Sequence, residues 1–297
     1  MMKVVGIVLF LMIGLIGFIC LFIAINVGWK LSHPKKQHVT DSPHRHHFDY
    51  EDVEFLSRDK TTKLRGWYLP TTKEQEKMTI IFIHGYTKNR EQDNFPFLTL
   101  AHSLVGAGYN VLLFDMRNSG ESSGSLTTLG QCEKEDVLGA VDWVKQHSNT
   151  KIGLLGVSMG ASTAIQAAAA EPSIIALVAD SPYHDLKEYL QSNLSKWSNL
   201  PNFLFTPLIM NILGPVTGIK PEKVTPIKSV DAVYPRPILF IHSIRDESVP
   251  YKGSEAMYNK HRDRFEFWKT TSEGHVLSYQ EDPIKYTQKV ISFFSNI

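Results

Sequence analysis

The sequence predicts an α/β fold with a mostly parallel central sheet and helices on both of its faces. The first observation behind this prediction is a series of short apolar runs, several of them continuous, as expected for strands covered on both sides. The second is that helix-favouring stretches separate most of these runs. Strand and helix therefore alternate, which favours parallel strands joined by right-handed crossovers, with a ligand site at the carboxyl ends of the strands.

Composition and charge exclude several function classes. The chain has 297 residues, of which 43% are hydrophobic and 21% charged, so it can bury one large core and is not disordered. Its 31 basic and 30 acidic residues give a net charge of +1, and we expect no nucleic-acid partner. Cys20 and Cys132 are the only cysteines, too few for a disulfide framework or a cysteine-based zinc site.

The first element is an uncharged, proline-free apolar segment from Val4 to Ile25. As a helix it is about 33 Å long, enough to cross about 30 Å of hydrocarbon, so we predict a single transmembrane anchor over residues 4–25. The alternative is a cleaved signal peptide, although the apolar part of such a peptide usually has only about 7–15 residues. Lys3 precedes the segment, and more basic residues follow it. The count of these basic residues favours a cytoplasmic position for the domain that follows. Very short amino-terminal tails obey this rule poorly, so the side of the membrane on which that domain lies stays open.

A polar stretch, residues 26–48, follows the apolar segment. It contains Pro34, Pro43 and the cluster His44 to His47, and it predicts a solvated tether. We assign these histidines no metal, because no cysteine or carboxylate cage accompanies them. The remaining residues, 49–297, are expected to form a domain that folds and acts without the anchor.

The domain is predicted to open with a hairpin and to continue with parallel strands. The hairpin strands are Val53 to Ser57 and Leu64 to Leu69, separated by a polar stretch. Between the later strands, valines at i, i+4 and i+7 (Val137, Val141 and Val144) indicate a helix, and Pro283 opens the last helix. The later strands are predicted at residues 78–83, 109–114, 152–157, 174–179, 238–241 and 265–268.

The strand at 152–157 ends in a motif that predicts a nucleophile. Residues 156–160 read Gly-Val-Ser-Met-Gly, and an alanine-rich helical stretch follows. A serine on a sharp strand-to-helix turn is strained, and the flanking glycines, Gly156 and Gly160, remove side chains that would clash there. We therefore predict Ser158 as the nucleophile; the alternative is a glycine-rich turn that only packs the helix on the strand.

A serine hydroxyl needs a base to take its proton and an acid to orient that base. Asp246 follows the predicted strand at 238–241, and His275 follows the one at 265–268, so both belong at the carboxyl edge of the sheet. We predict Asp246 as the acid and His275 as the base. Asp180, after the preceding strand, is the rival acid, and Arg245 is an alternative partner that would leave Asp246 a structural role.

An oxyanion needs backbone donors, commonly the amide after the nucleophile and one from the loop after an earlier strand. These amides are predicted to be those of Met159 and Tyr86. His84 lies beside Tyr86 in the sequence, and we expect it to brace this loop rather than to take part in the chemistry.

Together these motifs resemble the α/β-hydrolase superfamily, in its serine esterase, monoacylglycerol-lipase-like and serine-aminopeptidase-like branch. The likeness rests on residues 84–86, on the elbow at 156–160, on Asp246 with Gly274-His275, and on residues 115–122, which resemble the D-x-R-x-x-G-x-S loop of that branch. The likeness covers about residues 50–297. Within this superfamily the chain resembles single-pass membrane hydrolases of bacteria. The resemblance implies that the 115–122 loop supports the site and does no chemistry.

The resemblance also implies a helical cap at about residues 183–228, whose apolar side chains either line an acyl pocket or bury themselves on the core. The expected activity is hydrolysis of small-molecule acyl or lipid-like esters, with no metal and no organic cofactor. A peptidase or thioesterase with the same triad is the first alternative. A non-catalytic binding protein of the same fold is the second.

Overall fold

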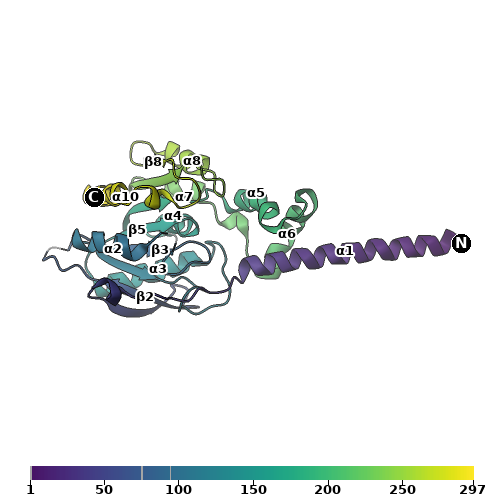
Figure 1. Ribbon diagram of the computed structural model, residues 1–297, viewed down its shortest axis with the longest axis horizontal. Coiled ribbons are helices and arrows are strands. Elements are labelled where there is room, and N and C mark those ends of the chain that lie inside the picture. The colour runs from purple at the N-terminus through teal and green to yellow at the C-terminus, as the bar shows by residue number, and fades with distance from the viewer. Residues whose placement is uncertain (1, 75, 94) are drawn as a thin grey trace.

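A computed structural model describes residues 2–74, 76–93 and 95–297, in which a sheet of eight strands is sandwiched between helices and one long helix projects from the domain (Figure 1). The spatial order is β1-β2-β4-β3-β5-β6-β7-β8. The pairs β1–β2 and β2–β4 are antiparallel and the remaining pairs are parallel. The strands are β1 Glu51–Leu56, β2 Lys63–Leu69, β3 Met78–Ile83, β4 Asn110–Phe114, β5 Lys151–Val157, β6 Ile174–Asp180, β7 Ile238–Ser243 and β8 Glu266–Thr270. The predicted α/β fold is confirmed, with strand ends that differ by a few residues.

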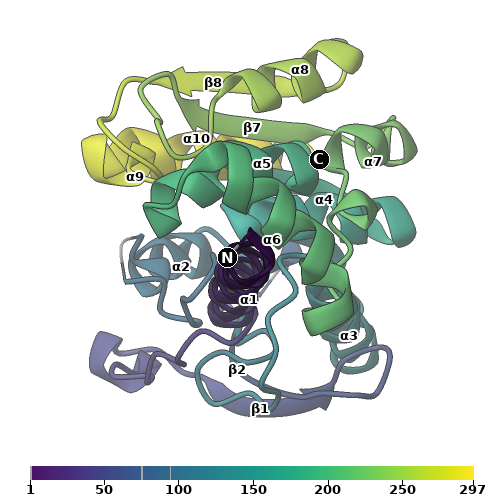
Figure 2. The same cartoon turned by 90° about the vertical axis from the view of Figure 1, so that its right-hand side faces the viewer.

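Helices cover both faces of this sheet. One core cluster includes α2, α9 and α10, and the other includes α3, α4, α7 and α8. The helices α5 and α6 lie on the side from which α1 projects, as Figure 2 shows in a view along α1. The helices are α1 Met2–Ser32, α2 Phe97–Gly106, α3 Glu133–His147, α4 Met159–Ala170, α5 Leu186–Ser198, α6 Asn202–Thr217, α7 Pro226–Val233, α8 Lys252–Lys260, α9 Ser278–Glu281 and α10 Pro283–Ser295; two 3₁₀ turns are η1 Pro43–His46 and η2 Pro221–Lys223.

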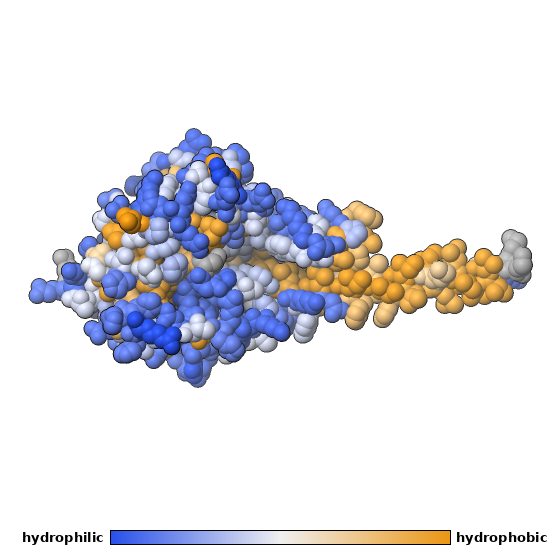
Figure 3. Space-filling model, in the orientation of Figure 1, coloured by the Kyte–Doolittle hydropathy of each residue, from blue (hydrophilic) through white to orange (hydrophobic). Residues whose placement is uncertain are grey.

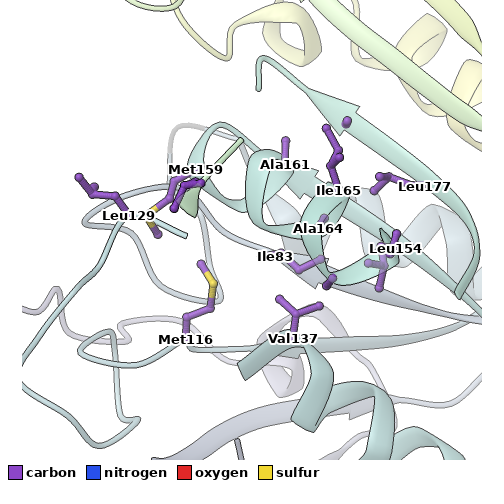
Figure 4. Close-up of a cluster of buried hydrophobic side chains, with 14 of the residues drawn as sticks. Ile83, Met116, Leu129, Val137, Leu154, Met159, Ala161, Ala164, Ile165 and Leu177 are labelled. Atoms are coloured by element: carbon purple, nitrogen blue, oxygen red, sulfur yellow. The ribbon is translucent and has the colours of Figure 1, made fainter. Parts of the chain in front are cut away.

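The core beneath α4 fixes where this helix begins. Ala161, Ala164 and Ile165 of α4 belong to one buried cluster with Ile83 and Leu154 of the central strands (Figure 4). All five side chains are fully buried, and the two alanines let the helix approach the sheet closely. The amino-terminal end of α4 is thereby held at the carboxyl ends of β3 and β5.

The helix α1 is long and apolar enough to cross a membrane, with a mean hydropathy of 3.1 over its best window. The large apolar side chains from Val4 to Phe22 are exposed, and Figure 3 shows this part of α1 as a continuous apolar rod outside the domain. That exposed part is about 28 Å long at 1.5 Å per residue, close to the hydrocarbon thickness of about 30 Å.

The predicted solvated tether, residues 26–48, is not what the structure contains. The helix α1 continues past Ile25 to Ser32. Its carboxyl-terminal turns pack against α6, so they are stabilised by contacts with the domain instead of being exposed to solvent. The residues after the helix lie on the domain: the Lys36 ammonium donates to the carbonyl of Ser122, and the Thr40 amide donates to the Glu91 carboxylate at 2.6 Å. The stretch from Asn26 to Phe48 is thus part of the folded structure.

Candidate active site

Ser158 stands at the turn between β5 and α4. Its backbone has φ 55° and ψ −119°, a conformation that costs a non-glycine residue free energy and that the surrounding packing enforces. A Cβ on Gly156 would lie 2.6 Å from the carbonyl oxygen of Gly160, and a Cβ on Gly160 would overlap the carbonyl oxygens of Ile83 and His84. The glycines on either side of the serine are therefore required by close backbone contacts.

A hydrogen-bonded chain links Ser158 to His275 and Asp246. The Ser158 hydroxyl lies 2.7 Å from Nε2 of His275, and Nδ1 of the same ring lies 2.6 Å from Oδ2 of Asp246. Because the carboxylate can only accept, Nδ1 carries the proton and Nε2 is free to accept the serine proton. The structure brings together the three residues predicted as nucleophile, base and acid.

The Asp246 carboxylate is buried and fully paired. Its Oδ1 accepts from the backbone amides of Ser248 and Val249, each at 2.9 Å, and its Oδ2 accepts from His275 and His242. Burial by itself would raise the pKa of Asp246, but the hydrogen bonds from the two histidines outweigh burial and hold this pKa well below its usual value. Asp246 is therefore ionised at neutral pH.

The two alternatives to this role of Asp246 have other partners. Asp180 accepts hydrogen bonds from the hydroxyls of Tyr286, at 2.8 Å, and Ser181, at 2.7 Å, and burial raises its pKa. Arg245 pairs with Glu273 at the surface, at 2.7 Å. Neither group competes for the contact between Asp246 and His275.

His242 is a residue of this site that the sequence did not single out. It is fully buried at the carboxyl end of β7, and its Nδ1 lies 2.8 Å from the Ser254 hydroxyl. Its Nε2 lies 2.8 Å from the carbonyl of Val249 and 3.2 Å from Oδ2 of Asp246, so Nε2 carries the proton and donates. The only signal in the sequence is its position four residues before Asp246, at the end of an apolar run.

The loop after β3 contains Tyr86, whose amide is the second predicted oxyanion donor. The Gly85 amide donates to the Gln92 side chain at 2.7 Å, which holds the loop so that the next residue, Tyr86, lines the same cavity as Ser158 and Met159. Met159 opens α4, where the first amide hydrogens of a helix have no partner within it. Gln92 was not anticipated from the sequence.

His84 braces this loop, as expected. Its Nδ1 donates to the Gly85 carbonyl at 2.8 Å, and its Nε2 accepts from the Met116 amide at 3.0 Å. The ring is fully buried, and burial lowers its pKa, so it remains the neutral tautomer that these two bonds require. It makes no contact with the Ser158 hydroxyl.

The loop at residues 115–122 is a buried support beside the site. The Asp115 carboxylate accepts from the backbone amides of Arg90, at 2.7 Å, and Glu121, at 2.9 Å. Gly120 has φ +43°, and a Cβ there would overlap the Asp115 carboxylate. The loop therefore needs a glycine at this position and has a structural role.

A cavity of about 350 Å³ opens beside Ser158, a volume suited to a small molecule. Its polar groups are few, and the cap helix α5 contributes Tyr189 and Trp197. The cap's apolar residues therefore divide between the two expected roles, because Tyr189 and Trp197 line the cavity whereas Leu190, Leu194 and Phe205 are buried in the core. Leu31, from the end of α1, also lines it.

Across residues 2–74, 76–93 and 95–297, no group of three or more His, Cys, Asp or Glu side chains has a metal-binding arrangement.

Comparisons with known proteins agree with this architecture. Residues 66–206 match the X-Pro dipeptidyl-peptidase (S15) family. The uncharacterized protein YqkD of Bacillus subtilis is 32% identical over 223 residues, which cover 74% of this chain and 72% of that one. The lysophosphatidylserine lipase ABHD12 of Xenopus tropicalis is 27% identical, over 69% of this chain and 52% of its own.

Among solved structures, an esterase of Pyrococcus furiosus, Pf2001, superposes with a TM-score of 0.75 at 27% identity. The match covers 90% of this chain and 98% of the esterase. The sheet order, the elbow and these relatives lead to one conclusion about ancestry: the chain belongs to the α/β-hydrolase superfamily.

Proposed function

We propose that this protein is a membrane-anchored serine hydrolase that cleaves carboxylic esters of acyl or lipid-like substrates. The observation that carries the proposal is the chain of hydrogen bonds from Asp246 through His275 to the Ser158 hydroxyl, at the edge of a largely apolar cavity. The esterase and lipase among the relatives support the reaction class.

The proposed reaction is a two-step acyl transfer. Ser158 attacks the ester carbonyl while His275 takes its proton and then gives it to the leaving alcohol. Asp246 holds the imidazole in the required tautomer, and the amides of Met159 and Tyr86 donate to the oxyanion. Water, deprotonated by His275, then attacks the acyl-enzyme and releases the acid. These steps require no metal and no organic cofactor.

The membrane part of the proposal rests on α1. Its exposed residues 4–22 match the thickness of a bilayer, and its last turns are docked on the domain, which favours an uncleaved anchor over a signal peptide. The apolar surface continues from α1 onto the cap helices (Figure 3), where Phe203 is 84% exposed. We therefore place the cap at the membrane surface. Carbonate extraction should leave the full-length chain in the membrane pellet; release of a shortened soluble chain would support the signal peptide.

The match to a peptidase family makes peptide hydrolysis the second candidate activity, because the same triad cleaves esters, amides and thioesters. A fluorophosphonate probe separates an enzyme from a binding protein, since it reacts only with an activated serine. A series of nitrophenyl esters, assayed beside aminoacyl anilides and acyl thioesters, separates the three activities. We expect labelling of the wild-type chain and the highest kcat/KM on an ester.

A further inference from the structure

The last turns of α1 are built into the domain. The helix α1 packs along α6, and Figures 1 and 2 show the two helices side by side. The face of α1 in contact with the domain carries small residues at every fourth position, namely Ala24, Gly28 and Ser32. A Cβ on Gly28 would lie 3.5 Å from the side chain of Leu213 in α6, so the two helices are in van der Waals contact there.

Groups of the domain satisfy the end of α1. The last carbonyls of a helix have no partner within it. Here the Tyr86 hydroxyl donates to the Leu31 carbonyl at 2.7 Å, and the Thr127 amide donates to the Ser32 carbonyl at 2.7 Å. Burial raises the pKa of Tyr86 to about 12, so its hydroxyl remains a donor at physiological pH. The helix end is thus attached to the loop that carries the proposed oxyanion amide.

The side chain of Leu31 is a second connection between the end of α1 and the site. It lines the cavity that contains Ser158, together with Tyr189 and Trp197 of α5. Leu31 is itself half-buried and packs against the core. One wall of the cavity therefore comes from the helix that we propose as the membrane anchor, outside residues 49–297.

We propose that the last turn of α1 is part of the substrate site, and that Leu31 sets the length and bulk of the acyl chain that the cavity accepts. This inference rests on the proposed ester hydrolysis and names the residue that selects among its substrates. The acyl chain passes between Leu31 and the aromatic side chains of α5, while the ester carbonyl faces Ser158. A larger side chain at position 31 shortens this space, and a smaller one extends it.

The test compares Leu31→Trp with Leu21→Trp in the full-length chain, held in lipid nanodiscs. Leu21 lies on the same helix but is 40% exposed and outside the cavity, so it controls for a bulky side chain in α1. With nitrophenyl esters from acetate to decanoate, Leu31→Trp should lower kcat/KM for decanoate at least about tenfold and leave acetate within about twofold. Leu21→Trp should keep the wild-type profile.

A second variant, Leu31→Ala, distinguishes a change in substrate preference from a folding defect in the tryptophan variant. It should move the preference toward longer chains, so the decanoate-to-acetate ratio changes in opposite directions in the two variants. Identical chain-length profiles in both variants and the control, or an equal loss for every ester, would overturn the role of Leu31 alone. No hydrolysis of any ester by the wild-type chain would overturn the proposed function, and this inference with it.

Discussion

Oδ2 of Asp246 lies 2.6 Å from Nδ1 of His275, and this contact orients the ring toward Ser158. Asp246→Asn should lower kcat by about four orders of magnitude, because the amide stabilises the imidazole tautomer whose Nε2 cannot accept the serine proton.

Asp180→Asn is the matched control, since Tyr286 can still donate to the new amide oxygen. It should stay within about tenfold of the wild-type kcat, on the same ester and at the same pH. If Asp180→Asn proved the more damaging change, the acid role would belong to Asp180.

His242 donates to Oδ2 of Asp246, the same oxygen that accepts from His275, which makes His242 a positioning residue. His242→Phe removes a hydrogen bond to a charged group, a loss of about 1.5 kcal/mol, and should lower kcat about tenfold with little change in KM. His242→Gln retains an N–H donor and should recover part of the rate. Steady-state kinetics of both variants check this, and a rise in KM at constant kcat would assign His242 to substrate binding instead.

Glu171 gives a pH-dependent contribution to stability far from the site. Burial would raise its pKa, but hydrogen bonds from Lys145, Arg58 and Ser173 outweigh burial and lower it from 4.5 to about 2. The folded state therefore gains stability above the unfolded pKa, and this gain is lost as the pH falls from about 4.5 toward 2. Glu171→Gln should cost about 2 kcal/mol at pH 7 and clearly less at pH 3.5.

Urea unfolding of both chains at the two pH values measures this difference in the free energy of unfolding. The carboxylate pairs with Arg58 at 2.8 Å and Lys145 at 3.0 Å, and its side chain is only 14% exposed. A loss of the same size at both pH values would show that packing, and not the charge, is responsible.

The docked end of α1 revises the expectation that residues 49–297 act fully without the anchor: a chain that begins at Asp49 should fold but be a poorer enzyme than the full-length protein. It lacks the Leu31 side chain and the carbonyl to which Tyr86 donates, and it exposes the face of α6 that α1 covers. We expect kcat/KM for a medium-chain ester to fall about tenfold, with a tendency to aggregate. Kinetics in detergent check this; full activity would show that α1 contributes only attachment.

The sequence predicts the strands well because a doubly covered parallel sheet leaves uninterrupted apolar runs, as in β3 and β4, where every residue is buried. It also predicts Ser158, His275 and Asp246, since the elbow needs glycines at fixed positions and the partners must follow strands. These constraints are local, and a single sequence displays them.

The contacts that the sequence left unpredicted are long-range. In the sequence, the change to polar residues after Trp29 and Lys30 predicts that the apolar helix ends there. Both residues are exposed, yet they share a turn with Gly28 and Ser32, which are buried against the domain. His242 is hidden within an apolar strand, and its role depends on a loop that returns to it. Such pairings depend on tertiary geometry that no periodicity encodes.

The central claim is that Ser158 is the nucleophile, and the most direct measurement is active-site titration of the full-length chain and its Ser158→Ala variant with a fluorophosphonate. We predict that one probe molecule binds per wild-type chain and abolishes ester hydrolysis. The alanine variant should unfold at the same urea concentration, take up no probe and lose about five orders of magnitude or more in kcat. Labelling of a folded Ser158→Ala variant, or hydrolysis at the wild-type rate, would contradict the account.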